Sequence, residues 1–119
     1  MTRKTDELAR VFKVLAVKNR LRIVMALKGR TLCVGAIAVQ LEVSQGAVSQ
    51  HLRVMRDAGL VIDEKRGYYV HYRLNGQTLD RWRKQIDMVL ALGEAPPRQC
   101  SRRIYKRCGA VHSRKERMP

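Results

Sequence analysis

Six residues between positions 45 and 56 have side chains of the kinds with which proteins read DNA. At about 100° per residue, a helix over this stretch would share one face among Gln45, Gly46, Ser49, Gln50, Arg53 and Arg56. Glycine and serine allow a close approach to base edges, and a glutamine amide can form two hydrogen bonds with adenine. The arginines further along suit phosphates better. The face lacks the Glu/Lys pairs of a merely solvated helix, so it predicts contact with a nucleic acid.

Three cysteines offer a second chemistry. The chain contains Cys33, Cys100 and Cys108, and an odd number argues for reduced thiols rather than a disulfide framework. Three thiolates would suit a trigonal site for a thiophilic ion such as arsenite, As(III), or antimonite, Sb(III). The alternative is that Cys33 is a small buried apolar residue and that the other two cysteines are incidental. Residue types alone leave both interpretations open.

The histidines and the common catalytic motifs add no further site to the prediction. His51 falls within the apolar arc of the same helix, which indicates a hydrogen-bonded structural histidine. His71 and His112 have no second histidine or carboxylate at ligand spacing. The sequence has no phosphate-binding glycine loop, no recognisable nucleophile–histidine motif and no paired carboxylates. We therefore expect no enzymatic activity and no organic cofactor.

Charge points to a polyanionic partner. The 119 residues are enough for one domain, and 25 Lys and Arg against 10 Asp and Glu give a net charge of +15. Residues 98–119 contain eight Lys or Arg and one Glu, so this basic tail holds +7 and residues 1–97 hold +8. No apolar run approaches the roughly 20 residues of a transmembrane helix. These features predict a cytoplasmic protein with no membrane partner.

Hydrophobic periodicity predicts the helices that position these residues. A first helix should follow Asp6 as its N-cap, a second should be capped by Asn19 and end near Gly29, and a third should cover about residues 32–41. Ser44 should cap the helix with the polar face, which Gly59 closes. Only residues 42–43 separate this helix from the one before it. That spacing predicts a helix-turn-helix whose second helix enters the DNA major groove.

A hairpin and a last helix follow. Residues 60–74 form two runs of β-branched and aromatic residues around Arg66-Gly67, which predicts a β-hairpin that acts as a wing. Its tip presents Lys65, Arg66 and Tyr69 for phosphate or the minor groove, although basic hairpin tips also serve solubility. Thr78 should cap a helix over residues 79–92. The predicted fold is mainly α with a small β-hairpin, a winged helix-turn-helix over residues 1–97 followed by the cysteine-containing tail.

The segment SQGAVSQHLRVMRDAGLV, joined to the wing YYVHYRL, resembles the ArsR/SmtB family of winged-helix repressors. The similarity covers about residues 8–92. It implies a homodimer built on the first and last helices and bound to double-stranded operator DNA. It also implies that an inducer lowers the affinity for DNA and so releases transcription.

The inducer sites of that family are matched only in part. Its arsenic-type pattern has two cysteines separated by one residue, whereas this chain has Cys33-Val34-Gly35. Its site on the last helix uses Asp and His, but here only Asp80 and Asp87 are present. We therefore predict a repressor that is released by a metal or metalloid on Cys33, Cys100 and Cys108. The alternatives are a thiol redox-responsive repressor on the same fold and a nonspecific architectural nucleic-acid-binding protein.

Overall fold

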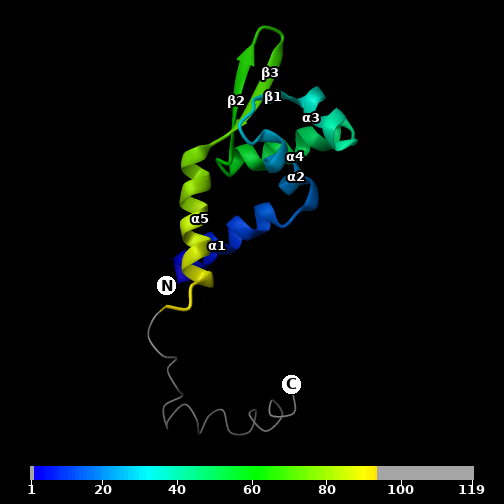
Figure 1. Ribbon diagram of the computed structural model, residues 1–119. Coiled ribbons are helices and arrows are strands. Elements are labelled where there is room, and N and C mark those ends of the chain that lie inside the picture. Colours follow the sequence, from blue (N-terminus) through cyan, green and yellow to red (C-terminus); the bar gives the residue numbers. More distant parts are fainter. Residues whose placement is uncertain (1, 94–119) are drawn as a thin grey trace, which may run out of the picture.

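Residues 2–93 are described in the computed structural model of the protein (Figure 1). Within this range the chain forms five helices and three strands in the order α1 (Thr2–Leu15), α2 (Lys18–Leu27), β1 (Leu32–Cys33), α3 (Val34–Leu41), α4 (Gln45–Asp57), β2 (Val61–Arg66), β3 (Tyr69–Leu74) and α5 (Gly76–Leu90). The tail over residues 98–119, with Cys100 and Cys108, lies outside the described residues.

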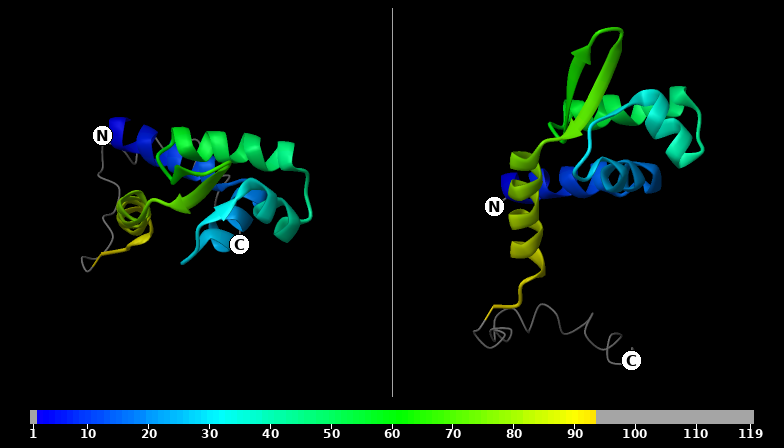
Figure 2. Two further views of the ribbon diagram at one scale, coloured as in Figure 1. Left: turned by 90° about the horizontal axis from the view of Figure 1, so that it is seen from above. Right: turned by 45° about the horizontal axis from the view of Figure 1, so that its top comes forward.

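The described part of the molecule has two distinct ends. Figure 1 shows the β2–β3 hairpin projecting beside α4 at one end, while α5 runs away from the hairpin and meets α1 at the other. Figure 2 shows the same arrangement from two further directions, with α5 crossing α1 at a steep angle. The arrangement is a winged helix-turn-helix, as the sequence predicts.

The core lies between α2, α3 and α4 and holds the reading helix in place. Its largest buried side chains are 1% exposed or less and are Ile23, Leu27, Ile37, Leu52, Met55, Val48 and Leu60. Burying a side chain of this size contributes about 1.5–3 kcal/mol to stability. Trp82 of α5 packs against this cluster and is 7% exposed. The 3.6-residue spacing of these apolar residues is the reason that the segments fold as helices with one buried face.

The turn between α3 and α4 depends on one left-handed residue. Glu42 has φ 58° and ψ 44°, and the Val43 backbone N–H donates to the Ala38 carbonyl over 3.1 Å. Nη2 of Arg22 donates to the Leu41 carbonyl over 2.9 Å, which ties α2 to the same turn. Ser44 then caps α4, since its hydroxyl oxygen accepts from the Ala47 N–H over 3.1 Å. The predicted cap at Ser44 is confirmed.

The sheet has one more strand than the sequence predicts. The hairpin is confirmed, with Arg66 opposite Tyr69 and a turn at Gly67, whose φ is 62°. Leu32 and Cys33, which were expected to begin the third helix, instead pair with Tyr72 and His71 of β3 in an antiparallel register. The strand order is therefore β1-β3-β2. So short a strand exists only because β3 offers an edge, and that edge is far away in the sequence.

Three predicted N-cap residues were wrong. α1 begins at Thr2, which places Asp6 inside the helix, and the N-cap of α2 is Val17, without a side-chain cap. Asn19 lies within α2 and accepts a hydrogen bond from Arg22. The N-cap of α5 is Asn75, whose side chain accepts from the Gln77 N–H, while Thr78 is 3% exposed inside the helix. In α5, Asn75 lies three residues before Thr78 and caps the helix instead.

Candidate nucleic-acid interface

One face of α4 is fully buried and the opposite face is open to solvent. Val48, Leu52 and Met55 are 0% exposed. The six residues predicted for the polar face are all exposed, and they are Gln45, Gly46, Ser49, Gln50, Arg53 and Arg56. A Cβ at Gly46 would meet no atom within 4 Å, so the surface there is open to an approaching ligand. No acidic side chain lies in the first turn of α4.

The first residue of α4 packs beside the start of α3. A Cβ at Gly35 would lie 3.6 Å from Nε2 of Gln45, which is ordinary van der Waals contact. Gly35 is two residues after Cys33. The side chain of Gln45 therefore lies beside the start of α3.

The wing presents cations and aromatic side chains together. Lys65, Arg66 and Tyr69 are exposed as predicted. The sequence interpretation missed Tyr68, which is 99% exposed at the turn, and Arg73, an exposed cation on β3. The period of two in a strand could have identified Arg73, because it lies on the same face as Tyr69.

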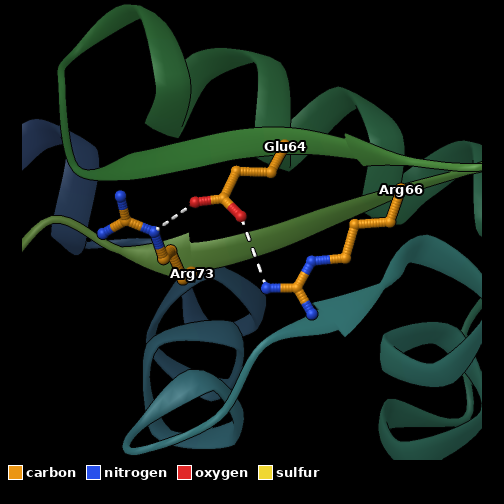
Figure 3. A network of polar contacts seen from close by, with 3 residues as sticks. All are labelled: Glu64, Arg66 and Arg73. Atoms are coloured by element: carbon orange, nitrogen blue, oxygen red, sulfur yellow. Dashed lines mark hydrogen bonds and ion pairs between the residues drawn. The ribbon is translucent and has the colours of Figure 1, made fainter.

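A carboxylate on β2 holds two of the wing arginines. Oε1 of Glu64 accepts from Nε of Arg73 over 2.9 Å, and Oε2 accepts from Nη2 of Arg66 over 3.4 Å (Figure 3). The hydrogen bond from Arg73 holds the pKa of Glu64 below its ordinary value, so the carboxylate stays charged at neutral pH. Glu64 thus orients both guanidinium groups on one face of the hairpin.

Arg56 has a partner as well. Its Nη1 lies 3.5 Å from Oδ2 of Asp63 on β2, and its Nη2 lies 3.9 Å from Oδ1 of Asp57. The exposed pair between Arg56 and Asp63 connects the last turn of α4 to the wing. Arg53, by contrast, has no ion pair among the described residues.

His51 is half-buried and hydrogen-bonded, although it does not lie in the buried core. Its Nδ1 accepts from Nε of Arg20 over 3.3 Å, and Nη1 of Arg20 also donates to the Val14 carbonyl over 3.3 Å. Burial, followed by the positive charge of Arg20, lowers the pKa of His51. The neutral imidazole therefore connects α4 to α2, which supports the structural role expected from the sequence.

This environment predicts a pH dependence of stability. Because the pKa of His51 is lower in the folded protein than the ordinary value of 6.5, the unfolded chain binds a proton more readily. The stabilising contribution is fully present above pH 6.5 and is lost as the pH falls through the lowered value. His51→Asn keeps an acceptor for Arg20 and does not titrate. Thermal unfolding between about pH 8 and pH 5 should show a steeper loss for wild type than for the variant. Equal slopes would contradict the assignment.

Cys33 lies at the junction of β1 and α3. It is half-buried and occupies the N-cap position of α3 without a side-chain cap. It stands opposite His71, whose buried Nδ1 has no hydrogen-bond partner among the described residues. Across residues 2–93 no group of three or more His, Cys, Asp or Glu could hold a metal ion. Any site with three thiolates would need residues from beyond this range.

This architecture, with the exposed polar face of α4 beside a basic wing, defines a winged helix-turn-helix protein. Residues 18–63 match the family model described as "Bacterial regulatory protein, arsR family". The arsenical resistance operon repressor of Escherichia coli (strain K12) is 38% identical over 101 residues, which cover 76% of this chain and 86% of that protein. The chain therefore belongs to the ArsR/SmtB family of transcriptional regulators.

Solved structures agree with this placement. The crystal structure of a possible transcriptional regulator for arsenical resistance is 36% identical, with a TM-score of 0.63 over 67% of this chain and 83% of that one. A homodimeric winged helix-turn-helix DNA-binding domain from Mycobacterium bovis, a possible ArsR-family regulator, is 26% identical, with a TM-score of 0.60 over 80% and 90%. These relatives are regulators rather than enzymes, which confirms the non-enzymatic class. None of the helices within residues 2–93 is long and apolar enough to cross a membrane.

Proposed function

We propose that the protein is a cytoplasmic, homodimeric repressor that binds a specific double-stranded operator and is released by a thiophilic metalloid on cysteine thiolates. The observation that carries the DNA part is the open polar face of α4, which is held on a buried core beside a basic wing. The net charge of +15 favours a polyanionic partner.

The residues divide between base reading and backbone binding. Gln45, Gly46, Ser49 and Gln50 are small or amide side chains and are proposed to contact base edges. Arg53, Lys65, Arg66 and Tyr69 are proposed to contact phosphates or the minor groove. Arg56 is proposed to contact a phosphate while its pair with Asp63 keeps the wing close to α4. Arg73 joins the wing cations, because Glu64 orients it together with Arg66.

The proposed dimer uses α1 and α5. The end of α5 exposes apolar side chains, with Met88 at 69%, Val89 at 56% and Leu90 at 72%, and Phe12 of α1 is 41% exposed. A second subunit on this surface would remove that apolar area from water. Residues 1–97 would then form the DNA-binding and dimerisation domain. The basic tail over residues 98–119 would add sequence-independent affinity through counterion release.

The proposed inducer site joins Cys33 to Cys100 and Cys108, with As(III) or Sb(III) as the bound ion. The support is the half-buried thiol at the start of α3, together with relatives whose names refer to arsenical resistance. The side chain of Gln45 lies near Gly35, two residues after Cys33, and this proximity is the proposed route from that thiol to the reading helix. Movement of α3 on binding would displace the polar face of α4.

The test is a footprint of the purified protein on the DNA upstream of its own gene. We expect protection of two half-sites about one helical turn apart, and an affinity at least about a thousandfold tighter than for random DNA at physiological salt. Sedimentation should show a dimer under the same conditions. A uniform affinity for every duplex would support the architectural alternative, and a stable monomer that bound equally well would contradict the dimer.

A further inference from the structure

A cleft of about 780 Å³ lies where α1, α4 and α5 meet, and its lining includes neither Cys33 nor a residue of the polar face of α4. This volume is in the range of small-molecule sites, which is about 300–1,000 Å³. Its apolar lining comes from all three helices and consists of Val11, Val14, Val54, Ala58 and Trp82. Val54 is 37% exposed where it borders the cleft, although the next residue, Met55, is fully buried in the core.

The charged groups of the cleft are mainly cations. Four cationic side chains line it against two carboxylates, and they are Arg10, Lys13, Arg20 and Arg81 against Glu7 and Asp57. Arg20 is already engaged with His51 and the Val14 carbonyl. Within residues 2–93 the other three cations have no ion pair. The guanidinium groups of Arg10 and Arg81 and the ammonium group of Lys13 are therefore free to bind an anion.

A neutral residue also borders the cleft. It is Gln85 of α5, whose Oε1 is buried with no hydrogen-bond partner among the described residues. This oxygen is closed off from solvent, so a molecule in the cleft does not reach it. The accessible lining therefore favours two features in one ligand, which are a negative charge and an apolar body.

We propose that this cleft binds a small organic carboxylate with an apolar body. The carboxylate lies among Arg10, Lys13 and Arg81, and the apolar body packs against Trp82. Such a molecule is an effector and not a cofactor, since it takes part in no reaction. Val54 lies one turn after Gln50 on the same side of α4, so an occupied cleft can shift the reading helix. This effect on DNA rests on the proposed function, whereas binding itself does not.

Trp82 is the only tryptophan of the chain, so its fluorescence reports on the cleft. The experiment titrates mandelate into the full-length protein without DNA, with mandelamide as the neutral analogue. We expect a saturable change in Trp82 emission with mandelate, and binding weaker by about tenfold or more with mandelamide.

The variants separate this site from general charge effects. Arg10→Gln combined with Arg81→Gln should weaken mandelate binding by about tenfold or more. Arg83→Gln removes a cation from the same helix outside the cleft, where Arg83 pairs with Asp80 at 3.2 Å, and should bind like wild type. The proposal is overturned if wild type shows no saturable change, if mandelate and mandelamide bind equally, or if the double variant binds like wild type. It is also overturned if mandelate fails to bind while the double variant weakens the dimer, because the partner subunit would then occupy the cleft.

Discussion

Replacing Gln50 with alanine is expected to lower the preference for operator over random DNA by about tenfold to a hundredfold. A bidentate amide–base pair contributes about 1–3 kcal/mol of discrimination, and alanine cannot form it. Gln50 is exposed on the polar face of α4, so its removal leaves the core untouched. Competition binding at one fixed salt concentration measures the ratio directly, because affinities at different salt concentrations cannot be compared.

Arg53→Ala tests a proposed phosphate contact and is the matched comparison for Gln50→Ala. Arg53 is exposed three residues further along α4, and its loss should weaken binding to operator and random DNA by a similar factor. The slope of log affinity against log salt should also fall by about one. Lys84→Ala removes a cation from α5 that pairs with Asp80 at 3.4 Å, and it serves as the charge control. Equal effects of Gln50→Ala and Arg53→Ala on discrimination would show that the base and phosphate contacts have been assigned wrongly.

Cys33→Ser is expected to abolish the release of operator DNA by arsenite while leaving operator affinity unchanged. In wild type, arsenite should lower operator affinity by roughly five- to 150-fold, the usual range of coupling between two sites. Serine is close to cysteine in size and supplies no thiolate to a thiophilic ion. Serine is also a favoured N-cap residue, and Cys33 occupies the N-cap of α3. A loss of response therefore cannot be attributed to loss of the helix.

The single variants Cys100→Ser and Cys108→Ser complete the test. Each should weaken the response to arsenite if all three thiolates bind the ion. If all three variants respond like wild type, the cysteines are not the sensor. Release by peroxide but not by arsenite would instead favour the thiol redox alternative. Operator release in each case can be followed by fluorescence anisotropy of labelled DNA, with unlabelled random DNA as competitor.

Patterns within a few residues were enough to predict much of this molecule. The apolar spacing of Val48, Leu52 and Met55 defined the buried face of α4, and the polar residues between them defined the open face. Ser44, Gly59 and Gly67 marked the cap, the helix end and the hairpin turn, because capping bonds and positive φ angles depend on local backbone geometry. The candidate DNA-reading residues follow from these short-range features.

Caps were less predictable where several candidates lay close together. Asn75 and Thr78 are both suitable N-cap residues, and the sequence does not show which of them the core will bury. Thr78 is buried because α5 packs against the core from its first turn, which leaves the capping role to Asn75. Asp6 and Asn19 likewise lie within helices that begin earlier.

The class of fold, the polar face of α4 and the basic wing could all be predicted from the sequence, because each depends on residues close together in the chain. Which distant groups meet depends on the tertiary structure. β1 forms only by pairing with β3, and this pairing sets Cys33 opposite His71. The same holds for the hydrogen bond from Arg20 to His51, the pair of Arg56 with Asp63, and the cleft between α1, α4 and α5. These contacts depend on how the helices pack, and packing is set by the fit of whole surfaces rather than by any local pattern.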